Sequence, residues 1–181
     1  MSRMKSRPRR LPLAIVTVLG LALGLALSAV GDTPEVPVLD VLRGPMPQNL
    51  IVIDGDTLKL DGQSIRLHGI DSPERRQTCD DGWPAGEEAR RTLAAIVAAG
   101  PVLCDRVSTD RYGRTVGTCK VDGRDVGEAM VRAGMAWAYT DYSRRYVADE
   151  QRARLDRLGV HARQCASPAA WRTSHPRQPV R

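Results

Sequence analysis

Three short strand-like segments separated by Asp-Gly pairs constrain the fold of this chain more than any other feature of its sequence. Residues 49–54, 56–61 and 64–70 carry β-branched residues and alternate apolar with polar side chains, and Asp-Gly pairs occupy 54–55 and 61–62. Alternation is typical of strands with one buried face, and Asp-Gly is a strong signal for a tight hairpin turn. We therefore predict three short strands joined by turns.

Two more strands and three helices complete the predicted pattern. The strands are expected at 101–107 and 114–121, and the helices at about 84–99, 124–134 and 143–158. Five short strands, with helices after the third and the fifth and at the end, predict a mainly β fold with helices (α+β). The architecture that fits this order best is a five-stranded OB-type barrel decorated by three helices. The chain contains no Phe, so its core must consist chiefly of Leu, Ile, Val and Ala.

The amino-terminal residues have the composition of an export signal. Five basic residues precede a run at 11–30 that is apolar and uncharged, and these are the two regions of a signal peptide. We expect residues 1–31 to be a signal peptide or an N-terminal membrane anchor. Both alternatives stay open, because the run is close to the roughly 20 residues that span a bilayer and could associate with the membrane. In either case the domain is exported: periplasmic, secreted, or anchored to the membrane with the domain outside the cytoplasm.

Composition divides the rest of the chain into three parts. Residues 32–47 contain four Pro and little periodicity, which predicts a linker before a folded domain at 48–162. The tail at 163–181 contains Pro and Arg and is expected to be irregular. We expect Trp171 to pack on the domain, because an indole ring is seldom left in water.

The net charge does not by itself indicate a nucleic-acid partner. The formal charge of the chain is +6, from 27 basic and 21 acidic residues. Five of the basic residues lie before the first acidic residue, so from residue 32 onward the balance is 22 against 21, or +1. Any case for a polyanionic substrate must therefore rest on the placement of particular residues.

The four cysteines allow disulfides, because export leads to an oxidising compartment. Cys104 and Cys119 lie on the fourth and fifth predicted strands, where a cross-strand disulfide is sterically plausible and two buried thiols are the alternative. Cys79 and Cys165 could also pair, although no local feature of the sequence positions them. The sequence leaves that second pairing open.

Three polar clusters carry the candidate chemistry. They are the DGDT segment at 54–57, the RLHGIDSPE segment at 66–74 and the DRYGR segment at 110–114. Each cluster alone is consistent with an ordinary turn or loop. Taken together they supply carboxylates, arginines and a hydroxyl residue at the ends of predicted strands.

This combination suits the hydrolysis of a phosphodiester. Asp56 and Asp71, with a backbone carbonyl, are the oxygen ligands that a hard cation such as Ca²⁺ prefers. Arg66 and Arg114 can grip a phosphate and stabilise the charge that builds on it. Glu74 can accept a proton from an attacking water. A cation, an arginine clamp and a carboxylate base are the parts that such a reaction requires.

With these three motifs in this order, the chain resembles the staphylococcal-nuclease-like (thermonuclease) family over about residues 50–160. The resemblance implies an OB-fold barrel in a hydrolase similar to the micrococcal-nuclease type of endonuclease. It implies Ca²⁺-dependent cleavage of DNA and RNA, with a preference for single strands and 3′-phosphate products. The alternative is a non-catalytic OB-fold module that binds single-stranded nucleic acid or a protein. A monomer is expected in either case.

The resemblance also assigns roles to the acidic residues. Asp56 and Asp71 look like the side-chain metal ligands, and Ser72 looks like the residue that offers its carbonyl. Glu74 is similar to the residue assigned as the base for the metal-associated water. Asp54 looks like a supporting carboxylate rather than a direct ligand.

The basic and aromatic residues of the motifs receive roles in the same way. Arg66 and Arg114 match the two arginines that hold the phosphate. By the same resemblance, Tyr112 would hydrogen-bond a terminal phosphate. Tyr142 would stack on a base, with packing at the barrel rim as the alternative.

Two positions depart from the pattern of the family. Related exported chains often have Cys where Ala85 stands, and Ala there leaves Cys79 without a local partner. His161 stands where many relatives have Trp, so the docking of the last helix is less well defined. None of these departures falls on a proposed metal, base or arginine position.

Overall fold

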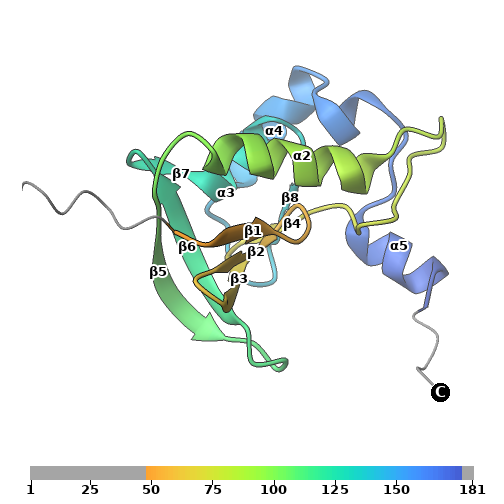
Figure 1. Cartoon of the computed structure of the whole chain (residues 1–181). Coiled ribbons are helices and arrows are strands. Elements are labelled where there is room, and N and C mark those ends of the chain that lie inside the picture. Colours follow the sequence, from red (N-terminus) through yellow and green to blue (C-terminus); the bar gives the residue numbers. More distant parts are fainter. Residues whose placement is uncertain (1–47, 177–181) are drawn as a thin grey trace, which may run out of the picture. The chain divides into compact units, whose positions relative to one another are not determined.

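A computed structural model describes residues 48–176 (Figure 1). Its strands are β1 (Leu50–Val52), β2 (Thr57–Leu60), β3 (Gln63–Leu67), β4 (Ile70–Asp71), β5 (Val102–Thr109), β6 (Thr115–Val121), β7 (Arg124–Asp125) and β8 (Trp137–Ala138). Its helices are α2 (Ala85–Val97), α3 (Val126–Arg132), α4 (Val147–Leu155) and α5 (Pro168–Ser174), with a 3₁₀ turn, η1, at Gly159–Ala162. The predicted α+β class is confirmed.

The main sheet follows the strand order β1-β2-β3-β6-β5. Strands β1, β2 and β3 form an antiparallel meander, β3 runs parallel to β6, and β5 pairs antiparallel with β6. The side chain of Gln48, just before β1, ties the two ends of this path together. Its amide donates to the carbonyl of Val102 (2.9 Å) and accepts from the Val102 N–H (2.8 Å). This is the five-strand order of the predicted OB-type fold.

The core lies where the main sheet meets α2 and α3. Strand alternation buries Ile65 and Leu67 of β3, while Leu93 of α2 and Met130 of α3 are fully buried in the same cluster. Burying one such side chain contributes about 1.5–3 kcal/mol. Because Ile65 and Leu67 point into the core, Arg66 between them must point to the opposite face of β3. That face carries the site described below.

The Asp-Gly pairs behave differently from one another. Asp61 and Gly62 both have positive φ (48° and 87°), as the predicted hairpin turn between β2 and β3 requires. The pair at 54–55 does not form such a turn. Gly55 instead lies so close to neighbouring segments that a Cβ there would stand 2.7 Å from Ala89 Cβ and from Ser72 Oγ. Glycine is needed at this position for space rather than for turn conformation.

The third predicted helix is shorter in the structure than the range 143–158. Ser143 N–H donates to the Tyr139 carbonyl in a turn, and regular helix begins only at Val147. At the other end Arg157 takes a left-handed conformation (φ 51°), which terminates α4, and η1 follows.

The tail was expected to be irregular, and that expectation is wrong for residues 168–174, which form α5. Ser167 caps this helix by accepting a hydrogen bond from the Ala170 N–H (3.3 Å) on its side-chain oxygen, and Pro168 stands in the first turn. Both residues are favoured at helix starts. The ring of Trp171 stacks on His175 of the same segment, with centroids 3.7 Å apart.

Two disulfides cross-link the domain. Cys104 and Cys119 are direct register partners on β5 and β6 and are bonded, as the strand assignment predicted. Cys79 is bonded to Cys165, the pairing that the sequence left open. This second bond connects the loop before α2 to the segment that leads into α5.

The predictions for residues 1–31 and 32–47 lie outside the described residues. Within 48–176, no helix is both long and apolar enough to cross a membrane.

Candidate active site

Two nearly buried aspartates share one guanidinium at the centre of the site. Arg66, on the outward face of β3, donates from Nη1 to Asp56 Oδ1 (2.6 Å) and from Nη2 to Asp71 Oδ1 (2.9 Å). Asp56 is 3% exposed and Asp71 is 5% exposed. The fold brings them together because Asp56 immediately precedes β2, the neighbour of β3, and Asp71 ends the short strand β4 that follows β3.

Asp56 is held from several sides. Its Oδ2 accepts the Ser72 N–H (2.9 Å), and its Oδ1 also accepts the hydroxyl of Thr57 (3.1 Å). Burial raises the pKa of Asp56 to about 6, although the positive charge of Arg66 opposes that rise. The carboxylate of Asp54, in the same loop, accepts the Asp56 N–H (3.1 Å). A buried carboxylate with a raised pKa is one that an additional cation would stabilise.

Glu74 lies in the loop that follows Asp71. The side chain of Gln77 fixes this loop, since its Oε1 accepts the Glu74 N–H (3.0 Å) while the Gln77 N–H donates to the Glu74 carbonyl (2.7 Å). The carboxylate of Glu74 accepts a hydrogen bond from Arg172 (2.9 Å). The same arginine also binds Asp71, so the candidate base and a candidate metal ligand share a partner.

Arg172 is a residue of this site that sequence reasoning missed. It belongs to α5, in the tail that was expected to be irregular, and lies 98 positions after Glu74. A local signal for the helix was present, because Ser167-Pro168 is a typical cap and first-turn pair. No local signal could have placed that helix beside Glu74.

Arg114 lies on the β5–β6 hairpin and pairs with Asp110. Its Nε donates to Asp110 Oδ2 (2.7 Å), and Asp110 Oδ1 accepts the backbone N–H groups of Tyr112 (2.9 Å) and Arg114 (3.0 Å). The partner of Arg66 across the parallel β3–β6 ladder is Val116. By strand alternation, Arg114 two residues earlier shares the sheet face of Arg66. The structure therefore places the two arginines on one face but gives Arg114 its own carboxylate partner.

The two tyrosines assigned from the motifs are both on the surface. Tyr112 and Tyr142 are each 69% exposed. The Arg114 guanidinium lies 5.7 Å from the centre of the Tyr112 ring, and Tyr142 packs edge-on against Tyr139 at 4.7 Å. Burial raises the pKa of the Tyr139 hydroxyl, and the nearby charge of Asp71 adds to that rise. Tyr139, which the sequence did not single out, contacts Tyr142 through its ring, and its N–H donates to the Gly69 carbonyl (2.8 Å) just before β4, the strand that ends at Asp71.

The donor set fits a hard cation held partly by protein and partly by water. Within residues 48–176, no group of three or more His, Cys, Asp or Glu side chains could hold a metal by itself. Asp56 and Asp71 nevertheless offer only oxygen atoms, and the adjoining Ser72 is buried at the same place. Ca²⁺ accepts carboxylates, backbone carbonyls and waters together. These three residues would hold it.

The fold and the oxygen-rich, arginine-lined site define a hydrolase-like OB domain, and comparisons with known proteins agree. Residues 64–164 match the family model described as "Staphylococcal nuclease homologue". The match covers more than half of the chain, and the chain belongs to that family. It is a hydrolase of the nuclease type, as the sequence motifs predicted.

Three relatives show the range of similarity. "Protein ParB" of Escherichia coli is 40% identical in an alignment over 156 residues that covers 75% of this chain and 82% of that protein. A protein named "Uncharacterized endonuclease" of Haemophilus influenzae is 31% identical over 129 residues, 67% of this chain and 69% of its own length. "Staphylococcal-like nuclease CAN1" of Arabidopsis thaliana is 35% identical over 117 residues, 64% of this chain but only 31% of the plant protein.

Proposed function

We propose that this nuclease is an exported, Ca²⁺-dependent phosphodiesterase that hydrolyses DNA and RNA to products with 3′-phosphate ends. The observation that carries the proposal is the pair Asp56 and Asp71, both of which bind the guanidinium of Arg66. Such a pair, nearly buried and with an adjoining carboxylate at Glu74, is suited to a divalent cation and a phosphate together. The reaction would require each of these groups.

Each side chain has a role that its position allows. Glu74, 29% exposed, would accept the proton of the attacking water. Arg66 would turn its terminal N–H groups toward the phosphate oxygens and stabilise their developing charge. Arg114 uses Nε for Asp110 and retains further donors for the same phosphate, because a guanidinium has five N–H groups. When bound, Ca²⁺ would supply positive charge beside the phosphoryl oxygens.

The aromatic pair supports a preference for single strands. Tyr142 is exposed and packs on Tyr139, whose N–H donates to the Gly69 carbonyl (2.8 Å) beside β4, the strand that ends at Asp71. An exposed ring beside the reacting centre can stack on an unpaired base of any sequence, whereas the bases of a duplex are already stacked. We expect Tyr142→Ala to raise KM for single strands more than it lowers kcat.

Two features support export: the composition of the amino-terminal segment and the two disulfides. The amino-terminal basic and apolar segments are typical of an export signal. All four cysteines are paired, which is common outside the cytoplasm and rare within it. Cell fractionation of the native protein would test the proposal, since recovery in the cytoplasm would contradict it.

The decisive experiment is cleavage of heat-denatured DNA and of RNA by the purified protein with Ca²⁺, with Mg²⁺ and with excess chelator. We expect rapid Ca²⁺-dependent cleavage that leaves 3′-phosphates, with a loss of at least about 100-fold in Glu74→Gln and in Arg114→Ala. Glu128→Gln on α3 and Arg124→Ala on β7 are matched controls that should retain activity. Binding of single strands by folded protein without cleavage under any condition would instead favour the non-catalytic binding module.

A further inference from the structure

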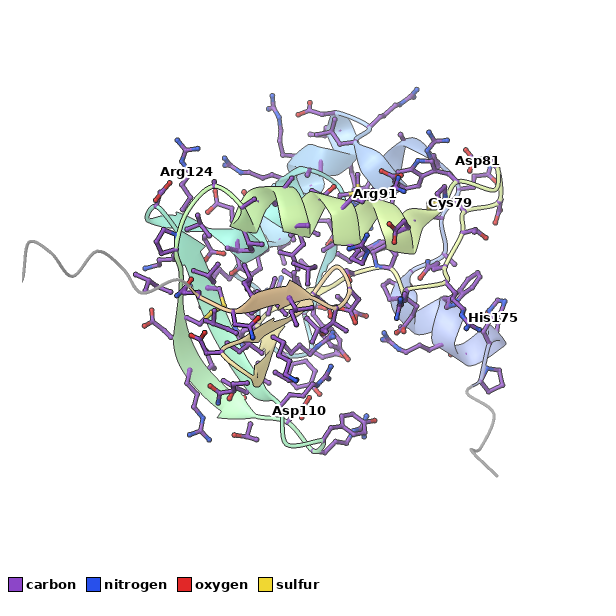
Figure 2. All side chains as sticks on the ribbon, in the orientation of Figure 1. Cys79, Asp81, Arg91, Asp110, Arg124 and His175 are labelled. Carbon is purple, nitrogen blue, oxygen red and sulfur yellow. A yellow bond between two sulfur atoms is a disulfide. The ribbon has the colours of Figure 1, made fainter. Side chains whose placement is uncertain are left out.

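The segment at 163–174, here called the C-terminal strap, is fastened to the loop that carries Glu74. Figure 2 shows Cys79 and Asp81 on this loop and His175 just beyond α5. Four ties join strap and loop: the Cys79–Cys165 disulfide, an ion pair between Arg163 and Asp81, and hydrogen bonds from Gln77 Nε2 to the Ala166 carbonyl (2.7 Å) and from the Asp80 N–H to the Gln164 carbonyl (3.1 Å). The strap is therefore packed and covalently fixed against the domain.

The geometry of α5 directs one side chain into the site. Pro168 is fully buried, and Arg172 stands four residues later on the same face of the helix. Trp171, one residue before Arg172, stacks its ring on that of His175 rather than on the acidic residues. The ties before Ser167 and the burial of Pro168 thus fix the position from which Arg172 reaches the acidic residues.

Arg172 makes three hydrogen bonds there. Its Nη2 donates to Asp71 Oδ2 (2.9 Å), and its Nη1 donates to Asp71 Oδ1 (3.2 Å) and to Glu74 Oε1 (2.9 Å). Asp71 is consequently held between two guanidinium groups, those of Arg66 and Arg172. Both oxygens of the Asp71 carboxylate already accept hydrogen bonds from arginines, so a metal ion that binds Asp71 competes with these positive charges.

We propose that Arg172 is a positioning residue of the active site, an internal cation that holds Asp71 and Glu74 and competes with the divalent cation for them. The proposal rests on the proposed function, because it takes Ca²⁺ as the competing cation. It assigns the strap a role in setting how tightly this site binds Ca²⁺. Neutralising Arg172 should therefore tighten Ca²⁺ binding rather than weaken it.

The test is isothermal titration of the whole protein with Ca²⁺ in the absence of nucleic acid. We expect Arg172→Gln and Arg172→Met to lower the Kd for Ca²⁺ by about fivefold or more, the scale at which coupled sites usually affect each other. Arg172→Lys keeps the charge but loses the two-pronged contact, so its Kd should fall between those of Gln and wild type. Arg152→Gln, which removes an equally charged but exposed arginine on α4, should leave the Kd unchanged.

Thermal unfolding without Ca²⁺ establishes that each variant is folded, and the two neutral variants are made in parallel for that reason. An equal or higher Kd in the folded neutral variants would overturn the proposal, and cleavage by wild type would then show that the proposed function still stands. A Kd for Ca²⁺ in Arg172→Lys as low as that in Arg172→Gln would also overturn the proposal. If no variant and no wild-type protein bound Ca²⁺, both this proposal and the proposed function would fail.

Discussion

At the scale of single residues, Asp56 shows how the site trades stability for function. Its carboxylate is buried, and burial raises its pKa to about 6 from the ordinary 3.8. A carboxylate with a raised folded-state pKa stabilises the fold below pH 3.8, and that stabilisation is lost as pH rises through about 6. We expect Asp56→Asn to remove this pH-dependent loss of stability. Urea unfolding of both proteins without Ca²⁺ would then show the variant gaining stability, relative to wild type, between pH 4 and 7.

A constant difference between the two proteins over that pH range would contradict the assignment. Asp61→Asn, at the turn between β2 and β3, is a matched control, because that aspartate is exposed.

The pKa of His161 is shifted in the opposite direction from that of Asp56. Its ring packs edge-on against Trp137 at 5.6 Å, and within the described residues its buried Nε2 has no hydrogen-bond partner. Burial lowers its pKa below 6.5, and the charge of Arg154 lowers it further. The folded state therefore resists the proton that the unfolded chain takes up, so stability is full above pH 6.5 and falls below it. His161→Phe should keep the ring contact and lose this acid sensitivity, as thermal unfolding from pH 7.5 to 5 would reveal.

At the scale of elements, the start of α2 packs directly on the loop that carries Glu74. A Cβ at Gly86 would stand 2.0 Å from the Glu74 carbonyl oxygen and 2.7 Å from that of Arg75. Both are backbone atoms, so Gly86→Ala must displace the loop or the helix. We expect a loss of about 2–3 kcal/mol in unfolding free energy and a large drop in cleavage rate, because Glu74 moves. Denaturant unfolding and kcat measured on one preparation would check both.

The control for this prediction is Gly82→Ala in the same loop. Gly82 has a positive φ (81°) but open space around its Cβ position. That variant should cost only the strain of about 1–2 kcal/mol and retain most of its activity. If Gly86→Ala and Gly82→Ala lowered the cleavage rate equally, the close packing at Gly86 would not be what positions Glu74.

At the scale of the whole molecule, the two disulfides close loops of very different length. Cys104–Cys119 spans 15 positions and Cys79–Cys165 spans 86. In the chain-entropy model these loops stabilise the fold by about 3 and about 4.5 kcal/mol. We expect Cys79→Ala/Cys165→Ala to lose more stability than Cys104→Ala/Cys119→Ala in guanidinium unfolding. The reverse order would show that the strap detaches locally without loosening the domain.

The separation along the chain between contacting residues determines which features could be predicted from the sequence. The strands around Leu58 and Ile65, and the motif residues Asp56, Asp71 and Glu74, were predictable because alternation, turn pairs and motif spacing are local signals. Arg172 and the partner of Cys79 were not, since each contacts residues more than 80 positions away. Only tertiary packing determines such contacts, and the short cap signal of α5 says nothing about where that helix docks.

The long covalent loop also bears on proteolysis. A single cut anywhere between residues 79 and 165 leaves the two pieces joined through Cys79–Cys165, and a cut in the β5–β6 hairpin leaves them joined by Cys104–Cys119 as well. The exposed hairpin tip at Tyr112 is the kind of site that proteases attack first. An enzyme nicked there would keep both fragments, with Glu74 on one and Arg172 on the other, in a single covalent molecule.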